Sequence, residues 1–334
     1  MAYRMTHYSF TYPAVNDHTP LFITVFYVAN SLINTRPFPS WTVPYLIVLL
    51  IIGSIGNVLT VILFFQKNLR QNTCYIYFFS LALADEVALL LPSIRRIIWI
   101  TYKLDVRSIN NFLCIADGFF TGYSSQKAAW ILAVISVDRC ISIVCTGKLK
   151  YTIRKTKFIA CVIITVTLLL VVVNFPHFLL RINSAKQCRG QISFSLSYTI
   201  IDLFVYTVLP FTTMIICNTI IIHKIRTLRR NLSAFKLQSS RTQGYEIQLT
   251  ISMLAISTMF LFLLFPYCFM VVYQAALKSG EHIFEITALI SYINHSINFY
   301  LYLIVAVNIR KEIIRLLKKF CNYFTQSDEL KTIT

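Results

Sequence analysis

Charged side chains inside long apolar stretches are the residues of this sequence best placed to do chemistry. Asp138 and Arg139 stand together near the end of an apolar stretch that begins at Cys114, and Asp85 lies in the middle of another. An ionised group within a hydrocarbon layer is costly, so each is expected to have a partner or a role. Such isolated charges favour binding, switching, and the handling of protons or small ions.

The sequence lacks the patterns that are typical of enzymes. It has no nucleophile paired with a base, no phosphate-binding loop, and no His/Cys cluster at metal-ligand spacing. Its net charge of +18 is compatible with nucleic-acid binding, but that function needs the basic residues on one soluble face. Here they fall between apolar blocks. We therefore predict neither an enzyme nor a nucleic-acid-binding protein.

The elements that must position these charges are membrane spans. The chain has 57% apolar and 13% charged residues and a mean hydropathy of +0.66, whereas an average soluble domain is about a quarter charged. A helix over Ile115–Val137 is long enough, at about 1.5 Å per residue, to cross a hydrocarbon core about 30 Å thick. The sequence predicts an all-α membrane protein, a seven-transmembrane helix bundle over residues 43–307. The seven apolar blocks are residues 43–65, 75–100, 112–144, 158–180, 194–222, 247–276 and 284–307.

Two terminal segments flank this bundle. Residues 1–42 are rich in proline and aromatic residues, with no recognisable signal peptide and no glycosylation acceptor, so we expect an extended extracellular tail. Residues 308–334 contain an amphipathic stretch over 308–320, which predicts a short eighth helix lying on plasma-membrane lipid. Cys321 follows it and is a candidate for palmitoylation, with an unmodified thiol as the alternative.

Charge and cysteine placement predict the orientation. The larger share of the Lys and Arg residues lies in alternate loops and in the C-terminal segment, which favours a multi-pass plasma-membrane protein with its N-terminus outside and its C-terminus cytoplasmic. Of the nine cysteines, only Cys114 and Cys188 fall at the outer ends of spans. A disulfide between them would tie the second outer loop to the third helix and stabilise the fold by about 2 to 4 kcal/mol. Two unpaired thiols are the alternative.

Several short motifs follow one another along the chain. They are Gly56-Asn57, Leu81-Ala82-Leu83-Ala84-Asp85, Cys114, Asp138-Arg139-Cys140, Pro210, Pro266 and Asn298-Phe299-x-x-Tyr302. In this order they resemble the motifs of rhodopsin-like (class A) G-protein-coupled receptors, and the resemblance covers residues 45–321. The last motif, together with Asn294-His295-Ser296, is similar to that of invertebrate FMRFamide-type neuropeptide receptors.

The sequence also departs from the family pattern. Leu264 replaces a tryptophan, Asn218 a tyrosine and Phe299 a proline, and the fourth helix has no tryptophan. Thr121 stands where amine receptors carry an aspartate, and Tyr292 where opsins carry the retinal-bearing lysine, so monoamine and light sensing are disfavoured. The resemblance implies a cell-surface receptor, for a neuropeptide, that signals through a heterotrimeric G protein. The alternatives are a receptor for a non-peptide chemosensory ligand, a non-signalling ligand scavenger, and a seven-span transporter, although the internal repeats typical of transporters are missing.

The resemblance assigns residues to two internal sites. A polar network is expected around Asn57, Asp85, Asn294 and His295, and it would hold an allosteric sodium ion or act as a proton-sensitive hydrogen-bond network. Helix gluing is the alternative. No other cofactor or metal is expected, and Ala128 replaces a serine that the family offers to sodium. Residues of the switch that couples to the G protein are Asp138, Arg139, Glu246, Asn298 and Tyr302.

Charges and aromatic residues near the outer ends of the spans predict the ligand site. They suit a peptide with a basic side chain and an aromatic end, such as an Arg-Phe-amide, better than a lipid or an amine. The alternative is that Arg95 or Arg96 pairs with Asp117 or Asp202, so that no charge is left for a ligand. The candidate residues are Arg95, Arg96, Asp117, Thr121, Asp202, Tyr267, Tyr273, Glu285 and Tyr292.

Overall fold

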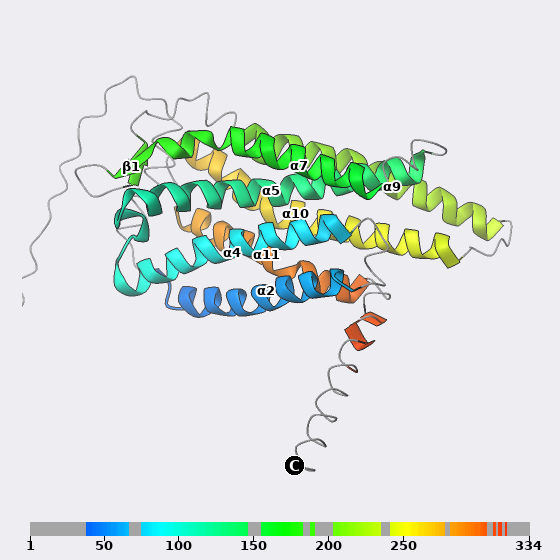
Figure 1. Cartoon of the computed structure of the whole chain (residues 1–334), viewed down its shortest axis with the longest axis horizontal. Coiled ribbons are helices and arrows are strands. Elements are labelled where there is room, and N and C mark those ends of the chain that lie inside the picture. The colour runs from blue at the N-terminus through cyan, green and yellow to red at the C-terminus, as the bar shows by residue number, and fades with distance from the viewer. Residues whose placement is uncertain are drawn as a thin grey trace, which may run out of the picture.

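A computed structural model shows a bundle of long helices that lie side by side along one axis, with a small β-hairpin at one end (Figure 1). It describes residues 38–66, 75–145, 155–182, 188–190, 203–234, 241–277 and 281–305, with short pieces of 310–318. Seven long helices occur in this described part, in agreement with the predicted seven-helix membrane fold. They are α2 (Thr42–Phe64), α4 (Tyr75–Tyr102), α5 (Asn111–Val144), α7 (Thr156–Val173), α9 (Leu209–Ala234), α10 (Arg241–Leu277) and α11 (Glu281–Val305).

Helix α5 is the central element of the bundle. It packs against α4, α7, α9 and α10. Six helices within the described residues are long and apolar enough to cross a membrane, and α5 is not among them. Its first half contains the polar run Tyr123–Lys127, which an outer, lipid-facing helix could not carry. Helix α5, which carries this polar run, therefore lies at the centre of the bundle, where other helices cover it.

Packing in the bundle separates a lipid-facing surface from an interior. Apolar side chains on the outer faces are exposed, with Phe262 of α10 at 75%. Inside, large residues such as Phe78, Ile135 and Phe260 are almost fully buried in one core. Apolar side chains face the lipid as well as the interior, so hydrophobicity does not distinguish the two sides of a helix. The buried side chains identify the face of each helix that contacts other helices.

A short β-hairpin adds to the all-α fold that the sequence predicts. Strands β1 (Leu180–Ile182) and β2 (Cys188–Gly190) pair antiparallel, with Ile182 opposite Cys188. The amide of Ile182 donates a hydrogen bond to the Asn111 side chain at 2.9 Å, so the hairpin is held at the first turn of α5. We call this end of the bundle the disulfide end, and the opposite end, which carries Arg139, the arginine end.

The elements differ from the predicted blocks at several boundaries. Helix α10 begins at Arg241, six residues before the predicted block, and α9 is preceded by a π-helical turn, η3 (Phe204–Val208). Residues 310–311 and 313–315 are helical, within the predicted eighth helix. Residues 1–37 of the predicted N-terminal tail, Asp202 and Cys321 lie outside the described residues.

Candidate functional site

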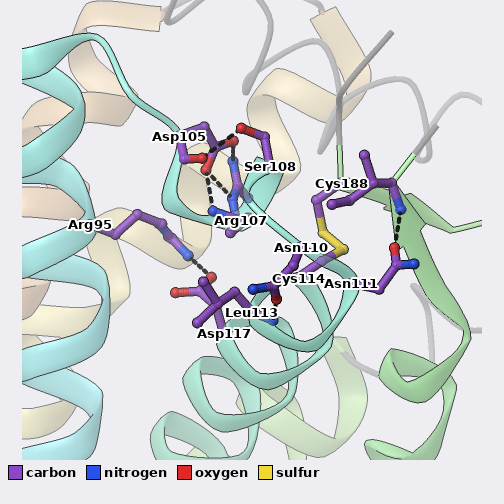
Figure 2. Close-up of a disulfide and its surroundings, with 11 residues drawn as sticks. Arg95, Asp105, Arg107, Ser108, Asn110, Asn111, Leu113, Cys114, Asp117 and Cys188 are labelled. Atoms are coloured by element: carbon purple, nitrogen blue, oxygen red, sulfur yellow. Dashed lines mark hydrogen bonds and ion pairs between the residues drawn. A yellow bond between two sulfur atoms is a disulfide. The ribbon is translucent and has the colours of Figure 1, made fainter. Parts of the chain in front are cut away.

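At the disulfide end, a covalent bridge joins the hairpin to α5 (Figure 2). Cys114 and Cys188, 74 residues apart in sequence, form a disulfide with their Cα atoms 5.6 Å apart. This confirms the bridge predicted from the cysteine positions. Asn110 caps α5 just before it, since its side chain accepts a hydrogen bond from the Leu113 amide at 2.8 Å. The hairpin therefore has covalent and hydrogen-bonded anchors on the same helical turn.

An ion pair between Arg95 of α4 and Asp117 of α5 lies beside this bridge (Figure 2). Both side chains are partly buried, at 27% and 14% exposure. The structure thus shows the alternative in which Arg95 neutralises Asp117. Arg96, the next residue, lies over the ring of Phe38, 5.2 Å from its centroid. Both arginines that the sequence marked as ligand contacts have intramolecular partners.

The turn between α4 and α5 contains a second ion pair. Asp105 begins the 3-10 turn η1 (Val106–Ser108) and accepts hydrogen bonds from the Arg107 amide at 3.0 Å and from its guanidinium at 2.9 and 3.0 Å. Burial by itself raises the pKa of Asp105, but the hydrogen bonds and charge of Arg107 outweigh it and leave that pKa below its usual value. The loop is therefore fixed by a carboxylate that stays ionised.

Aromatic candidates from α10 and α11 lie close to other rings. The ring of Tyr267 lies 5.5 Å from that of Phe284, and the ring of Tyr273 lies 6.2 Å from that of Phe269. The first contact joins α10 to α11 and places the two helices in one aromatic wall. Tyr292 and Glu285 of α11 are half-buried.

Thr121 of α5 is half-buried, and its hydroxyl oxygen has no hydrogen-bond partner among the described residues. A buried hydroxyl normally finds a partner. The Thr121 hydroxyl is therefore a candidate to donate a hydrogen bond to a ligand or to accept one from it.

Deep in the bundle, the predicted polar network is assembled around Asp85, which is 1% exposed. Its Oδ1 lies 2.8 Å from Nδ1 of His295, and its Oδ2 accepts a hydrogen bond from the Asn298 amide at 2.6 Å. The Asn57 amide lies between two partners, the Glu86 carboxylate at 3.0 Å and the His295 carbonyl at 3.3 Å. Asn294, the remaining predicted member, is buried in α11. The network joins α2, α4 and α11.

Glu86 is a network member that the sequence analysis missed. It follows Asp85 directly and is a second ionisable residue at the same depth in an apolar helix. That placement alone was a sufficient signal, since an acid in mid-membrane is a functional candidate by default. Glu86 escaped attention because the short motif that marks this helix ends at Asp85.

At the arginine end, Asp138 and Arg139 are both 4% exposed and form an ion pair with each other. The Arg139 Nε donates to Asp138 Oδ2 at 2.8 Å, and Asp138 Oδ1 accepts no hydrogen bond within the described part of the chain. Glu246 belongs to α10, in a stretch whose side chains are outside the described ones. Tyr302 of α11 is buried against Phe78, with ring centroids 4.7 Å apart.

The structure also shows polar contacts of α5 that the sequence analysis did not single out. The Trp130 indole donates to the Val205 carbonyl at 2.8 Å, and the Asn174 amide donates to Gln126 at 2.5 Å. The Lys127 ammonium lies 5.6 Å from the centre of the Tyr123 ring. The sequence around these polar residues has no periodicity that indicates which neighbouring helix each of them contacts.

Comparison with known proteins agrees with this architecture. Residues 56–302 match the family described as "7 transmembrane receptor (rhodopsin family)". Melatonin receptor type 1B-B of Danio rerio is 24% identical over 298 residues, which cover 84% of this chain and 83% of the relative. C-C chemokine receptor type 9 of Homo sapiens is 24% identical over 333 residues, covering 91% and 84%. These relatives are similar along nearly their whole length but are named for different kinds of ligand.

Proposed function

The chain belongs to the rhodopsin family of seven-transmembrane receptors, the class A G-protein-coupled receptors, and from this premise we propose that its extracellular ligand is a peptide. Members of this family are cell-surface receptors that signal through heterotrimeric G proteins and are not enzymes. The named relatives leave the ligand class open. The proposal therefore depends on the chemistry of the disulfide end, which we place outside the cell, with the C-terminus in the cytoplasm.

The observation that supports a peptide most directly is the aromatic wall formed by Tyr267 and Phe284. Rings 5.5 Å apart on α10 and α11 offer a packing surface for an aromatic side chain, and Glu285 follows directly after Phe284. Thr121 adds a hydroxyl without a partner among the described residues. Aromatic packing with a few polar contacts suits a peptide that has a basic and an aromatic residue.

We propose a structural role at the ligand site, and not a ligand contact, for Arg95, Arg96 and Asp117. Their charges are already engaged, by the Arg95–Asp117 pair and by the ring of Phe38. For a basic residue of the ligand we propose Asp202 or Glu285 as the acidic partner, the two carboxylates that the sequence suggests. A charge-assisted hydrogen bond of that kind contributes about 1.5 to 3 kcal/mol.

In this proposal the ligand starts signalling by changing the position of α10. A peptide that packs on Tyr267 contacts α10 and α11 at once, and it biases the bundle only as far as it binds one conformation better than the other. We propose that α10 moves outward at the arginine end, separates Glu246 from Arg139, and exposes a surface for the G protein. Asp138 holds Arg139 in the resting arrangement.

A peptide-library screen tests this function in cells that co-express a promiscuous G protein. We expect a peptide with a basic and an aromatic residue to drive guanine-nucleotide exchange. A Tyr267→Ala variant should then lose affinity for it, whereas Phe262→Ala, a change on the lipid-facing side of the same helix, should not. Activation by small non-peptide molecules alone contradicts the proposal. Peptide binding without nucleotide exchange identifies a scavenger, and solute flux identifies a transporter.

Asp202 is tested by a double-mutant cycle on the activating peptide. Asp202→Asn in the receptor and Arg→Ala in the peptide should each weaken binding, and the combination should weaken it little further. If the two losses add, Asp202 does not contact the basic residue. The same cycle with Glu285→Gln then decides between the two carboxylates.

A further inference from the structure

The carboxylate of Asp85 has both of its oxygens bound by protein groups, and we propose that the His295 side chain, rather than a sodium ion, is its counter-group in this receptor. The proposal concerns regulation of the resting bundle and does not depend on which ligand binds at the disulfide end. It also departs from the sodium site that the sequence resemblance implies at Asp85.

Each oxygen of the Asp85 carboxylate has a hydrogen-bond partner on α11. Nδ1 of His295 lies 2.8 Å from Oδ1, and the amide of Asn298 donates to Oδ2 at 2.6 Å. His295 and Asn298 are one turn apart on α11, so both face the same carboxylate of α4. Asp85 and His295 are 1% and 5% exposed, which keeps bulk water from competing for these bonds.

The two side chains that contact the carboxylate do not present oxygen ligands to a hard cation. Such an ion prefers several oxygen ligands from carboxylate, carbonyl and hydroxyl groups. His295 presents a ring nitrogen instead, and the N–H of Asn298 points its positive end at the second oxygen. Ala128, where the family offers a serine hydroxyl, is fully buried and carries no oxygen on its side chain. The groups in direct contact with Asp85 are therefore hydrogen-bonding nitrogen groups.

Further charges nearby are also engaged. Glu86, next to Asp85 on α4, accepts a hydrogen bond from Asn57 of α2, and Tyr302 of α11 lies within electrostatic range of Asp85. Neither α2 nor the described side chains of α10 carry a charged group. On α5, Lys127 lies over the Tyr123 ring and Asp138 pairs with Arg139. Among the described side chains, His295 is thus the ionisable group that contacts the Asp85 carboxylate directly.

Asn57 makes the arrangement a three-helix clamp. Besides Glu86, its amide reaches the backbone carbonyl of His295 at 3.3 Å. The histidine is therefore bound through its ring to α4 and through its backbone to α2. These contacts hold α11 against α4 and α2 through groups of the protein itself.

The ion dependence of thermal stability tests the proposal on the purified, full-length receptor. Melting temperatures are compared in NaCl and KCl, each at roughly 0.15 M so that screening is equal. An ion that binds the folded state raises the melting temperature with its concentration. We expect the parent to melt within about 1 °C in the two salts. A higher melting temperature in NaCl that Asp85→Asn or Glu86→Gln removes would overturn the proposal.

Variants of His295 test its role as the counter-group. His295→Leu removes the partner of a buried carboxylate and should lower the melting temperature by about 5 °C or more, while His295→Gln, which keeps an N–H donor, should lower it less. His223→Leu, at an exposed position of α9, is the control and should leave it unchanged. If His295→Leu melts like the parent in both salts, the proposal fails. If no His295 variant folds, the comparison of salts on the parent decides alone.

Discussion

The indole N–H of Trp130 in α5 donates to the backbone carbonyl of Val205 at 2.8 Å, within the π-helical turn that precedes α9. A π-helical turn shifts the carbonyl positions of its helix relative to a regular α-helix. Here one of those carbonyls accepts a hydrogen bond from a side chain of the central helix, which fixes the π-helical turn before α9 against α5.

Replacing Trp130 by Phe should therefore destabilise the receptor. A smaller aromatic ring remains but the Val205 carbonyl loses its donor, at a cost of about 1 kcal/mol for a hydrogen bond between membrane helices. The melting temperature of the purified receptor measures it. Trp99→Phe is the matched control, because the structure shows no indole hydrogen bond for Trp99 among the described residues. Equal shifts in the two variants would mean that ring packing, and not the hydrogen bond, is responsible.

Arg95 and Asp117 should behave as a coupled structural pair. Arg95→Gln and Asp117→Asn are each expected to lower stability, and the double variant should lose less than the sum, by a coupling of about 1 kcal/mol after allowance for partial exposure. Reversal of both charges, with Arg95→Asp and Asp117→Arg, should recover part of the loss. Additive losses would show that the pair is not formed in the membrane.

Acidification should loosen the turn between α4 and α5. The pKa of Asp105 is lowered in the folded state, so its contribution is complete above the ordinary aspartate pKa of about 3.9 and is lost as the pH falls through the folded value. Asp105→Asn keeps a cap for η1 but removes the charge. The parent should melt higher than this variant near neutral pH, and the two curves should converge in acid. Parallel curves down to strongly acidic pH contradict the assignment.

Gly122 of α5 should not tolerate a larger residue. A Cβ atom there would lie 3.0 Å from the Asn174 side-chain oxygen and 3.0 Å from Nε2 of His177. We expect Gly122→Ala to cost about 1 to 3 kcal/mol, as overpacking does, and to reduce the amount of receptor at the cell surface. Adding His177→Ala should restore part of the loss. No recovery would place the conflict at Asn174.

Loss of the disulfide should weaken the hairpin and the ligand site together. Cys114→Ser and Cys188→Ser are each expected to destabilise the receptor by about 2 to 4 kcal/mol and to lower surface expression and ligand binding. Cys161→Ser, at an exposed free cysteine, should change neither. Normal surface expression of both bridge variants would show that the hydrogen bond from Ile182 to Asn111 suffices to hold the loop.

The sequence by itself determined the number of spans, the disulfide partners and part of the buried network, but it missed Glu86. These properties follow from span length, from the placement of cysteines at the outer ends of spans, and from the cost of charge in a hydrocarbon layer. Asp85 and His295 could be predicted to lie at a similar depth in the membrane from their positions along their own spans.

Only the tertiary structure decided which polar groups meet. Asp85 and His295 are 210 residues apart, and helices that are apolar on all sides carry no periodic signal for the rotation that brings them together. The same holds for Arg95. The sequence left its acidic partner open, and the packing of α4 on α5 brings it to Asp117. Rotation and depth of each helix arise from side-chain packing across the whole bundle, so the pairing of charges is a property of the assembled fold.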